Sequence, residues 1–170
     1  MRTLLLFSFL AMTVSLSAQK KIEITDQFTI EGKVKSQITF SLKDLNVFAH
    51  KLIDSIIIYS HLMEPRKTIM NIKGVLLKDI LDKAGIDVSS PKLLSEFYIT
   101  CSASDNYKVV FSWNEIYNSA IGEHIMIIIG SDGKTGDQMT DRIALLSAAD
   151  RATGRRYVKG LQKIVIEQVT

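Results

Sequence analysis

The chain has 170 residues, of which 46% are hydrophobic and 23% charged, and its formal net charge at pH 7 is +3. So small a charge excludes the strongly basic surface with which proteins bind nucleic acids or anionic membranes. Its two prolines and nine glycines form no linker, repeat or low-complexity stretch, so the length indicates one domain with its own core.

The first 18 residues have the pattern of a secretory signal peptide. Arg2 precedes an apolar run over residues 4–16, and small residues follow it up to Ala18. The run is too short to span a bilayer comfortably. We therefore expect cleavage near Ala18, a mature single domain over residues 19–170 and a periplasmic or secreted location. No transmembrane segment is expected after cleavage.

Strands surround one short helix in the first part of the mature chain. Ser41 has the position of a helix N-cap, Asp44 completes a capping-box pattern, and apolar residues at helical spacing predict a helix over residues 41–52. A polar stretch over residues 61–67 separates the next two strands. Strands or strand-like segments are predicted over residues 27–34, 38–40, 56–59 and 68–72.

The rest of the chain begins with the clearest helix, over residues 74–85, which Gly85 is placed to end. A turn at 102–106 joins two strands into a hairpin, and Ser112 with Glu115 predicts a capped helix that ends near Ser119. Further strands are predicted over residues 97–101, 107–111, 123–129, 142–147 and 163–169.

Strands outnumber the helices in this pattern, and strand and helix do not alternate regularly. Regular alternation is what a parallel α/β sheet requires. We therefore predict an α+β fold with a mixed, mainly antiparallel sheet and short helices.

The cysteine and histidine content offers little for catalysis. Cys101 is the single cysteine, so no internal disulfide can form, and its apolar strand is typical of a small core residue rather than of a nucleophile. His50, His61 and His124 lack metal-ligand spacing. We expect His61, in the irregular polar stretch, to be the histidine nearest to a pocket.

The loop after residue 129 only partly matches a phosphate-binding loop. Gly133, Lys134 and Thr135 follow an apolar strand, but the motif needs a glycine at position 128, where the chain has Ile128. Lys134 also stands where a calcium loop needs an oxygen ligand. We interpret this loop as a polar connection between strands.

A cationic segment precedes the last predicted strand. Gly154 is followed by Arg155, Arg156 and Lys159, whose guanidinium and ammonium groups are donors suited to a phosphate, a sulfate or another oxyanion. A solvated basic turn is the alternative, and composition alone favours it.

Three segments carry a family resemblance. The first is the glycine and leucine-rich helix that ends in Ala-Gly, residues 74–85. The second is the serine-rich turn Ser-Ala-Ser-Asp-Asn-Tyr with its strand and capped helix, residues 102–115. The third, residues 154–164, has the pattern Gly-x-Arg-x-Val-Lys-x-Leu-x-x-Ile. In this order they resemble the molybdopterin-binding domain of the sulfite oxidase family, over most of the chain from about Gly32. The resemblance implies that domain's fold.

The chain departs from that family at the metal ligand. In active members a cysteine thiolate, a soft ligand, holds the metal about a dozen residues before the glycine of the leucine-rich helix. Here that region is residues 59–65, which contain no cysteine, and Cys101 does not match the position. Asn106 replaces the turn glycine and tolerates the left-handed backbone. The resemblance thus leaves molybdopterin as a candidate cofactor and argues against bound molybdenum.

These patterns support three functional hypotheses. The first is an exported binding module without redox catalysis, which holds a pterin-like or other anionic small molecule. The second is an active molybdenum-cofactor oxidoreductase in which Ser60 or His61 replaces the thiolate. The third is a protein-interaction domain whose pocket has closed and whose partner is a protein. The residues expected to line a ligand site are His61, Asp105, Tyr107, Arg142, Arg155, Arg156 and Lys159. Alternatives remain open for Asp105, as a turn-stabilising side chain, and for Tyr107, as a packing residue.

Overall fold

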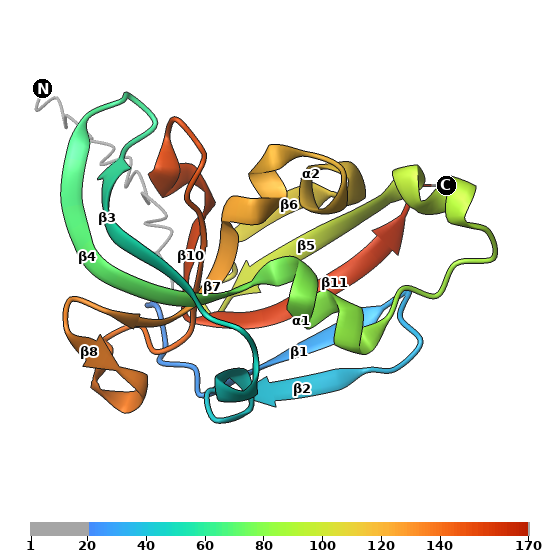
Figure 1. Cartoon of the computed structure of the whole chain (residues 1–170), viewed down its shortest axis with the longest axis horizontal. Helices are drawn as coiled ribbons and strands as arrows, with labels where there is room; N and C mark the ends of the chain where they lie inside the picture. Colours follow the sequence, from blue (N-terminus) through green and yellow to red (C-terminus); the bar gives the residue numbers. More distant parts are fainter. Residues whose placement is uncertain (1–20, 170) are drawn as a thin grey trace, which may run out of the picture.

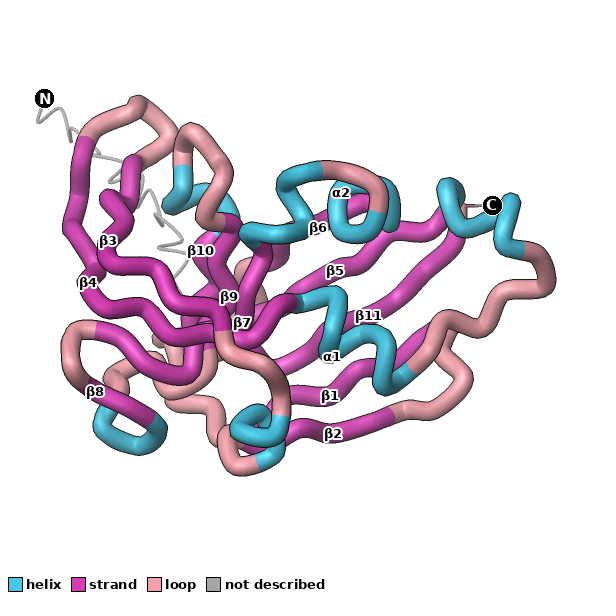
Figure 2. Tube along the Cα trace, viewed as in Figure 1, coloured by secondary structure: helices cyan, strands magenta, loops and turns pink. Residues whose placement is uncertain are grey.

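The computed structural model describes residues 21–169, so the expected signal peptide lies outside the described residues. Two sheets pack together in the described part, and short helices lie at their ends (Figure 1). Strands dominate the trace in Figure 2. The expected α+β class, with mixed and mainly antiparallel sheets and short helices, is confirmed.

The first sheet has the strand order β2-β1-β11-β5-β6. Its one parallel pair is β1 with β11, and the other neighbours are antiparallel. Burial alternates along β5, as expected for a strand with one face on the core. The bounds of these strands are β1 Gln27–Gly32, β2 Ile38–Ser41, β5 Phe97–Ala103, β6 Lys108–Ser112 and β11 Leu161–Gln168.

The second sheet has the order β10-β9-β7-β4-β3, and the short strand β8 also pairs with β7. All of its pairs are antiparallel. The apolar run of β7 is buried on both faces, because its odd-numbered isoleucines face one core cluster and Met126 and Ile128 face the other. The bounds are β3 Lys51–Tyr59, β4 Pro65–Leu76, β7 Ile125–Ser131, β8 Lys134–Thr135, β9 Ala144–Ser147 and β10 Tyr157–Lys159.

The helices are short and cover the ends of the sheets. In α1, Leu77–Ala84, the predicted apolar face is buried, and Gly85 ends the helix with a φ of 63°. In α2, Trp113–Tyr117, the predicted capping box of Ser112 and Glu115 is present. Within residues 21–169 no helix is long and apolar enough to cross a membrane. The 3-10 turns are η1 Asp44–Val47, η2 Pro91–Glu96, η3 Ala120–His124, η4 Gly136–Gln138 and η5 Thr153–Arg156.

The predicted helix over residues 41–52 is wrong. Ser41 and Asp44 do exchange hydrogen bonds, with the Ser41 N–H donating to the Asp44 carboxylate at 2.8 Å, but only the turn η1 follows. The apolar spacing does not mark one buried face, because Leu45 is buried whereas Ala49 is exposed and Leu52 is 71% exposed. From residue 51 the chain pairs with β4 instead, and this long-range ladder overrides the local helical pattern.

Two further boundaries differ from prediction. The predicted polar stretch forms the β3–β4 turn only as far as Glu64, because β4 already begins at Pro65. β4 then continues to Leu76, past the expected start of the next helix at residue 74. Arg142, expected at the start of a strand, lies before β9 in a turn with a φ of 43°. His50, within the predicted helix, lies in the connection just before β3.

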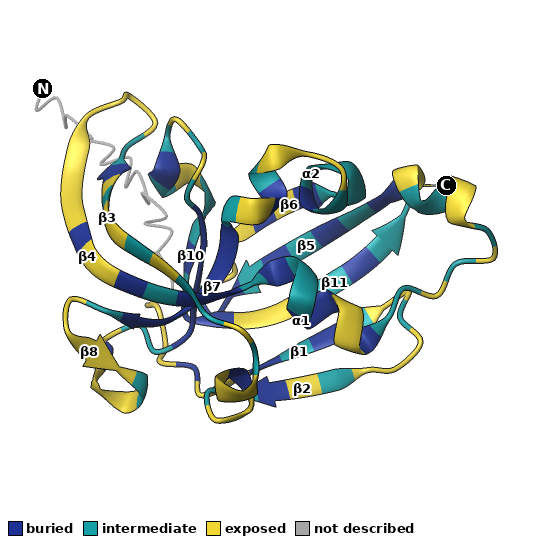
Figure 3. Ribbon diagram, viewed as in Figure 1, coloured by how far each residue is buried: buried dark blue, intermediate teal, exposed yellow. Residues whose placement is uncertain are grey.

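The main core lies between the first sheet, α1 and the near face of the second sheet (Figure 3). It includes Phe28, Ile30, Phe97 and Phe111, all of them almost fully buried. Cys101 is also part of this core, as predicted from its apolar strand. A smaller cluster on the other face of the second sheet joins residues of β3, β4, β7 and β9. The two clusters fix the positions of the strands from which the candidate site residues project.

Candidate functional site

The cationic segment folds as the turn η5 followed by β10, and η5 packs against the end of β3. The Thr153 hydroxyl accepts a hydrogen bond from the Tyr59 N–H at 2.8 Å and donates one to the Ile57 carbonyl at 2.9 Å. A Cβ on Gly154 would stand 2.7 Å from the Tyr59 carbonyl oxygen, so a glycine is needed for this approach. In Figure 1 the β3 arrow ends beside this turn, which comes just before β10.

Arg156 faces carboxylates of the chain itself. Its Nη2 and Nε donate to the two oxygens of Asp150 at 2.6 and 2.7 Å, and its Nη1 donates to Glu115 at 2.8 Å. The Asp150 hydrogen bonds, and then the Glu115 bond, raise the pKa of Arg156 beyond its usual range, against the opposing effect of burial. Its charge is therefore engaged by two carboxylates of the fold.

The turn that contains Asp105 and Tyr107 also contacts η5. Asp105 accepts a hydrogen bond from the Tyr107 N–H at 2.9 Å, which is the turn-stabilising arrangement, and Asn106 has the expected left-handed conformation with a φ of 71°. The Tyr107 hydroxyl donates to the backbone carbonyl of Arg155. The structure thus brings Asp105, Tyr107 and Arg155 together, with the side chain of Arg155 exposed.

The remaining predicted residues are dispersed. His61 is exposed in the turn between β3 and β4. Arg142 forms an ion pair with Asp26, and Lys159 forms one with Asp141 at 3.6 Å. The seven residues do not line one common hollow, since Lys159 and Arg142 face two different ones.

Lys159 lines a small hollow of about 220 Å³, which we call the Tyr157 hollow. The Lys67 and Lys159 ammonium groups lie 5.3 and 5.5 Å from the centroid of the Tyr157 ring. Burial, and then the nearby charge of Lys159, lower the pKa of Lys67. The charges of Asp141 and Asp132 act on Lys67 in the opposite sense. Its lining is Lys67, Ser131, Asp132, Lys134, Met139, Thr140, Asp141, Tyr157 and Lys159.

Sequence reasoning missed Lys67, Lys134 and Tyr157. Tyr157 lies inside the cationic segment and could have been named there, since an aromatic ring between cations is a frequent binding surface. No local sequence pattern marks Lys67 as a site residue. It comes from β4, which reaches β10 only through the pairing of β4 with β7, β7 with β9 and β9 with β10.

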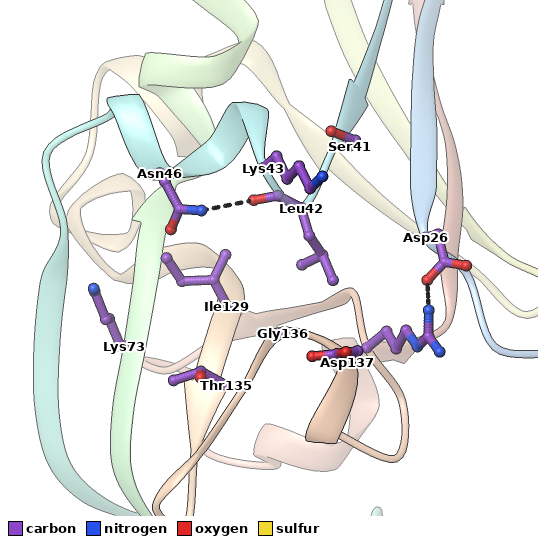
Figure 4. A pocket seen from close by; sticks show the side chains of 11 residues that line it. Asp26, Ser41, Leu42, Lys43, Asn46, Lys73, Ile129, Thr135, Gly136 and Asp137 are labelled. Atoms are coloured by element: carbon purple, nitrogen blue, oxygen red, sulfur yellow. Dashed lines mark hydrogen bonds and ion pairs between the residues drawn. The ribbon is translucent and has the colours of Figure 1, made fainter.

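A larger hollow of about 590 Å³, which we call the Arg142 hollow, lies where η1, β4, β7 and the segment after β8 meet (Figure 4). Figure 4 shows the Leu42 and Ile129 side chains between Lys73 and Asn46 on one side and Asp26 on the other. Its lining is Asp26, Ser41, Leu42, Lys43, Asn46, Lys73, Ile129, Thr135, Gly136, Asp137 and Arg142.

The residues present do not fit a thiolate-held metal. Burial raises the pKa of the Cys101 thiol to about 12, and this cysteine lies in the core. In the segment where the family has its ligand, the Ser60 hydroxyl accepts the N–H groups of Leu62 and Glu64 at 3.2 and 3.3 Å, and His61 is exposed. Within residues 21–169 no three His, Cys, Asp or Glu side chains are grouped to hold a metal ion.

Comparison with known proteins supports the fold alone. No model of a known protein family matches the chain, and no curated protein matches it. Solved structures do match. One is the sulfane dehydrogenase SoxCD from Paracoccus pantotrophus, with a TM-score of 0.62 and 15% identity. The match covers 87% of this chain and 41% of the dehydrogenase chain, so this chain spans about two fifths of that length. The described domain therefore has a fold similar to that of the sulfite oxidase family, a distant relationship at the level of structure.

Proposed function

We propose that the chain is a binding domain for an oxyanion-bearing small molecule, without redox catalysis of its own, and that the Tyr157 hollow holds the oxyanion. The observation that carries this proposal is the pair of ammonium groups, Lys67 and Lys159, over one tyrosine ring. Burial, and then the charge of Lys159, lower the pKa of Lys67, and a doubly charged oxyanion beside both ammonium groups would offset the second of these effects.

The geometry of the hollow suits a small charged group. Its volume of about 220 Å³ admits a phosphate or sulfate group, while a pterin or another larger body would extend beyond it. The Tyr157 hydroxyl and the Lys134 ammonium supply further donors at its lining. Asp132 and Asp141 are the competing anions at this lining. Asp132 already accepts the Met70 N–H at 2.7 Å, and the 3.6 Å separation of Asp141 from Lys159 is long for a charge-assisted hydrogen bond.

The absence of redox catalysis is proposed from the residues at the expected ligand position. Residues 59–65 contain no cysteine, and Cys101, the chain's single cysteine, is fully buried in the core and away from that segment. We also propose, from the composition of residues 1–18, that the domain acts in the periplasm or outside the cell. Its expected partner is the small molecule itself.

Calorimetric titration of the mature protein with inorganic phosphate tests this proposal. We expect saturable binding that weakens about tenfold in Lys67→Met and in Lys159→Met, because each variant removes one charged contact. Lys92→Met removes one exposed charge far along the chain, in η2, and should leave the affinity unchanged. Equal affinity in all four proteins would overturn the site.

Elemental analysis decides between a binding domain and an active oxidoreductase. The protein should be exported by a host that makes the molybdenum cofactor, then analysed for molybdenum, tungsten and pterin fluorescence after acid oxidation. Pterin without metal would support the binding function. Stoichiometric metal with pterin would contradict it and direct the search for a ligand to Ser60 and His61.

A further inference from the structure

The Arg142 hollow is a second and separate cavity with the size of a small-molecule site. Its volume is about 590 Å³, within the range of several hundred cubic ångströms typical of ligand pockets. The segment over residues 131–142 contributes to both hollows, but no residue lines both. The two cavities are therefore built from different side chains.

The lining combines an apolar floor with polar groups around it. Leu42 and Ile129 supply the apolar surface, and Asn46, Thr135 and Lys73 stand around them (Figure 4). An inorganic anion would fill only part of this volume and would leave the apolar surface wet. The apolar surface of Leu42 and Ile129 therefore favours a ligand that has an apolar body.

The charges around the hollow favour a monoanion. Lys43, Lys73 and Arg142 oppose Asp26 and Asp137, which leaves one net positive charge. Asp26 is engaged by Arg142. Among residues 21–169, neither Lys43 nor Lys73 forms an ion pair. Two ammonium groups thus line the hollow without a carboxylate partner from the described part of the chain.

Arg142, which lines this hollow, has an energetically unfavourable backbone conformation. Its φ of 43° lies in the left-handed region, which is rare for residues other than glycine and concentrates at functional sites. Its buried Nε has no hydrogen-bond partner among the described residues. The Asp26 contact uses Nη1, so the Nη2 edge is available for a second carboxylate.

We propose that the Arg142 hollow binds a small organic acid. The carboxylate lies at the free edge of the Arg142 guanidinium, the apolar body lies on Leu42 and Ile129, and the charges of Lys43 and Lys73 attract the acid to the hollow. The site is independent of the oxyanion site in the Tyr157 hollow.

Titration of ¹⁵N-labelled mature protein with hexanoate, followed by amide chemical shifts, tests this proposal. We expect saturable shifts at Leu42, Lys73 and Ile129. Affinity should rise about tenfold from butanoate to hexanoate, because two more methylene groups are buried. Hexanamide has the same shape without the charge, and it should bind at least tenfold more weakly.

Charge variants locate the acid within the hollow. Lys43→Met and Lys73→Met should each weaken hexanoate binding several-fold, while Lys92→Met should not. Equal binding of hexanoate and hexanamide, shifts at other residues, or unchanged affinity in both lysine variants would overturn the proposal. Lys67→Met separates the two sites, because it should weaken phosphate binding and leave hexanoate binding intact. Either site can therefore fail without the other.

Discussion

The guanidinium carbon of Arg156 lies 4.4 Å from the centroid of the Phe111 ring. Phe111 belongs to β6 and is fully buried, whereas Arg156 comes from η5 and also binds Asp150 and Glu115. Glu115 is the capping-box residue of α2. One arginine therefore fastens η5 to the edge of the first sheet and to the start of a helix.

Removing the Arg156 guanidinium should destabilise the domain. We expect Arg156→Met to lower the free energy of unfolding by about 3 kcal/mol, because Asp150 and Glu115 would remain partly buried without their partner. Arg156→Lys should recover only part of this, since an ammonium cannot form the same fork of hydrogen bonds. Urea denaturation measures both. Arg155→Met, at an exposed side chain, is the control, and an equal loss there would contradict the assignment.

Stability should fall in acid through Glu115. Burial alone would raise the pKa of Glu115, but hydrogen bonds from the Ser112 backbone and from Arg156 outweigh burial and hold that pKa below its usual value of 4.5. A lowered folded-state pKa contributes stability that is complete above the unfolded pKa and is lost as pH falls through the folded one. The stability difference between the wild type and Glu115→Gln should therefore shrink below about pH 4.5. A difference that stays constant from pH 7 to pH 3 would refute this.

The Thr153 hydroxyl should contribute measurably to the free energy of unfolding. Thr153→Val keeps the shape but leaves the Tyr59 N–H and the Ile57 carbonyl without their partner, at a cost of about 1–3 kcal/mol. The free energy of unfolding measures this loss. Thr140→Val, at an exposed threonine, should change stability by less than about 0.5 kcal/mol. Similar values for the two variants would show that the hydroxyl does not join η5 to β3.

Cys101 should be inert toward thiol reagents while the protein is folded. Its pKa is raised to about 12 by burial, so at pH 8 almost no thiolate exists and none is accessible. We expect no reaction with a chromogenic disulfide reagent in the native state and one equivalent after denaturation. Rapid native-state reaction would place the thiol at the surface and reopen it as a candidate ligand.

Local chemistry made much of the fold predictable. The Ser112–Glu115 capping box, the terminating Gly85 and the hairpin around Asn106 each depend on neighbouring residues, and each is present. The helix over residues 41–52 failed because the same local reasoning has no access to the ladder between β3 and β4. A capping pair fixes one turn, while a long-range pairing decides the conformation of the residues after that turn.

The candidate sites were less predictable, because their residues meet through the sheet. The cationic segment contained Lys159, but its companion Lys67 lies far earlier in the chain and reaches Tyr157 only in the folded sheet. Arg156 was expected to bind a ligand, and its charge is instead engaged by Asp150 and Glu115. A charge run shows which cations exist, whereas the fold decides which of them are already neutralised.

The middle strand of the first sheet is also the strand of that sheet that is synthesised last. β11 lies between β1 and β5, so a nascent chain that has not reached Leu161 holds two hairpins with nothing to join them. This sheet cannot fold strand by strand from the amino end, because both earlier hairpins pair with β11, which is synthesised after them. A truncation ahead of Leu161 would therefore remove the centre of the sheet and not its edge.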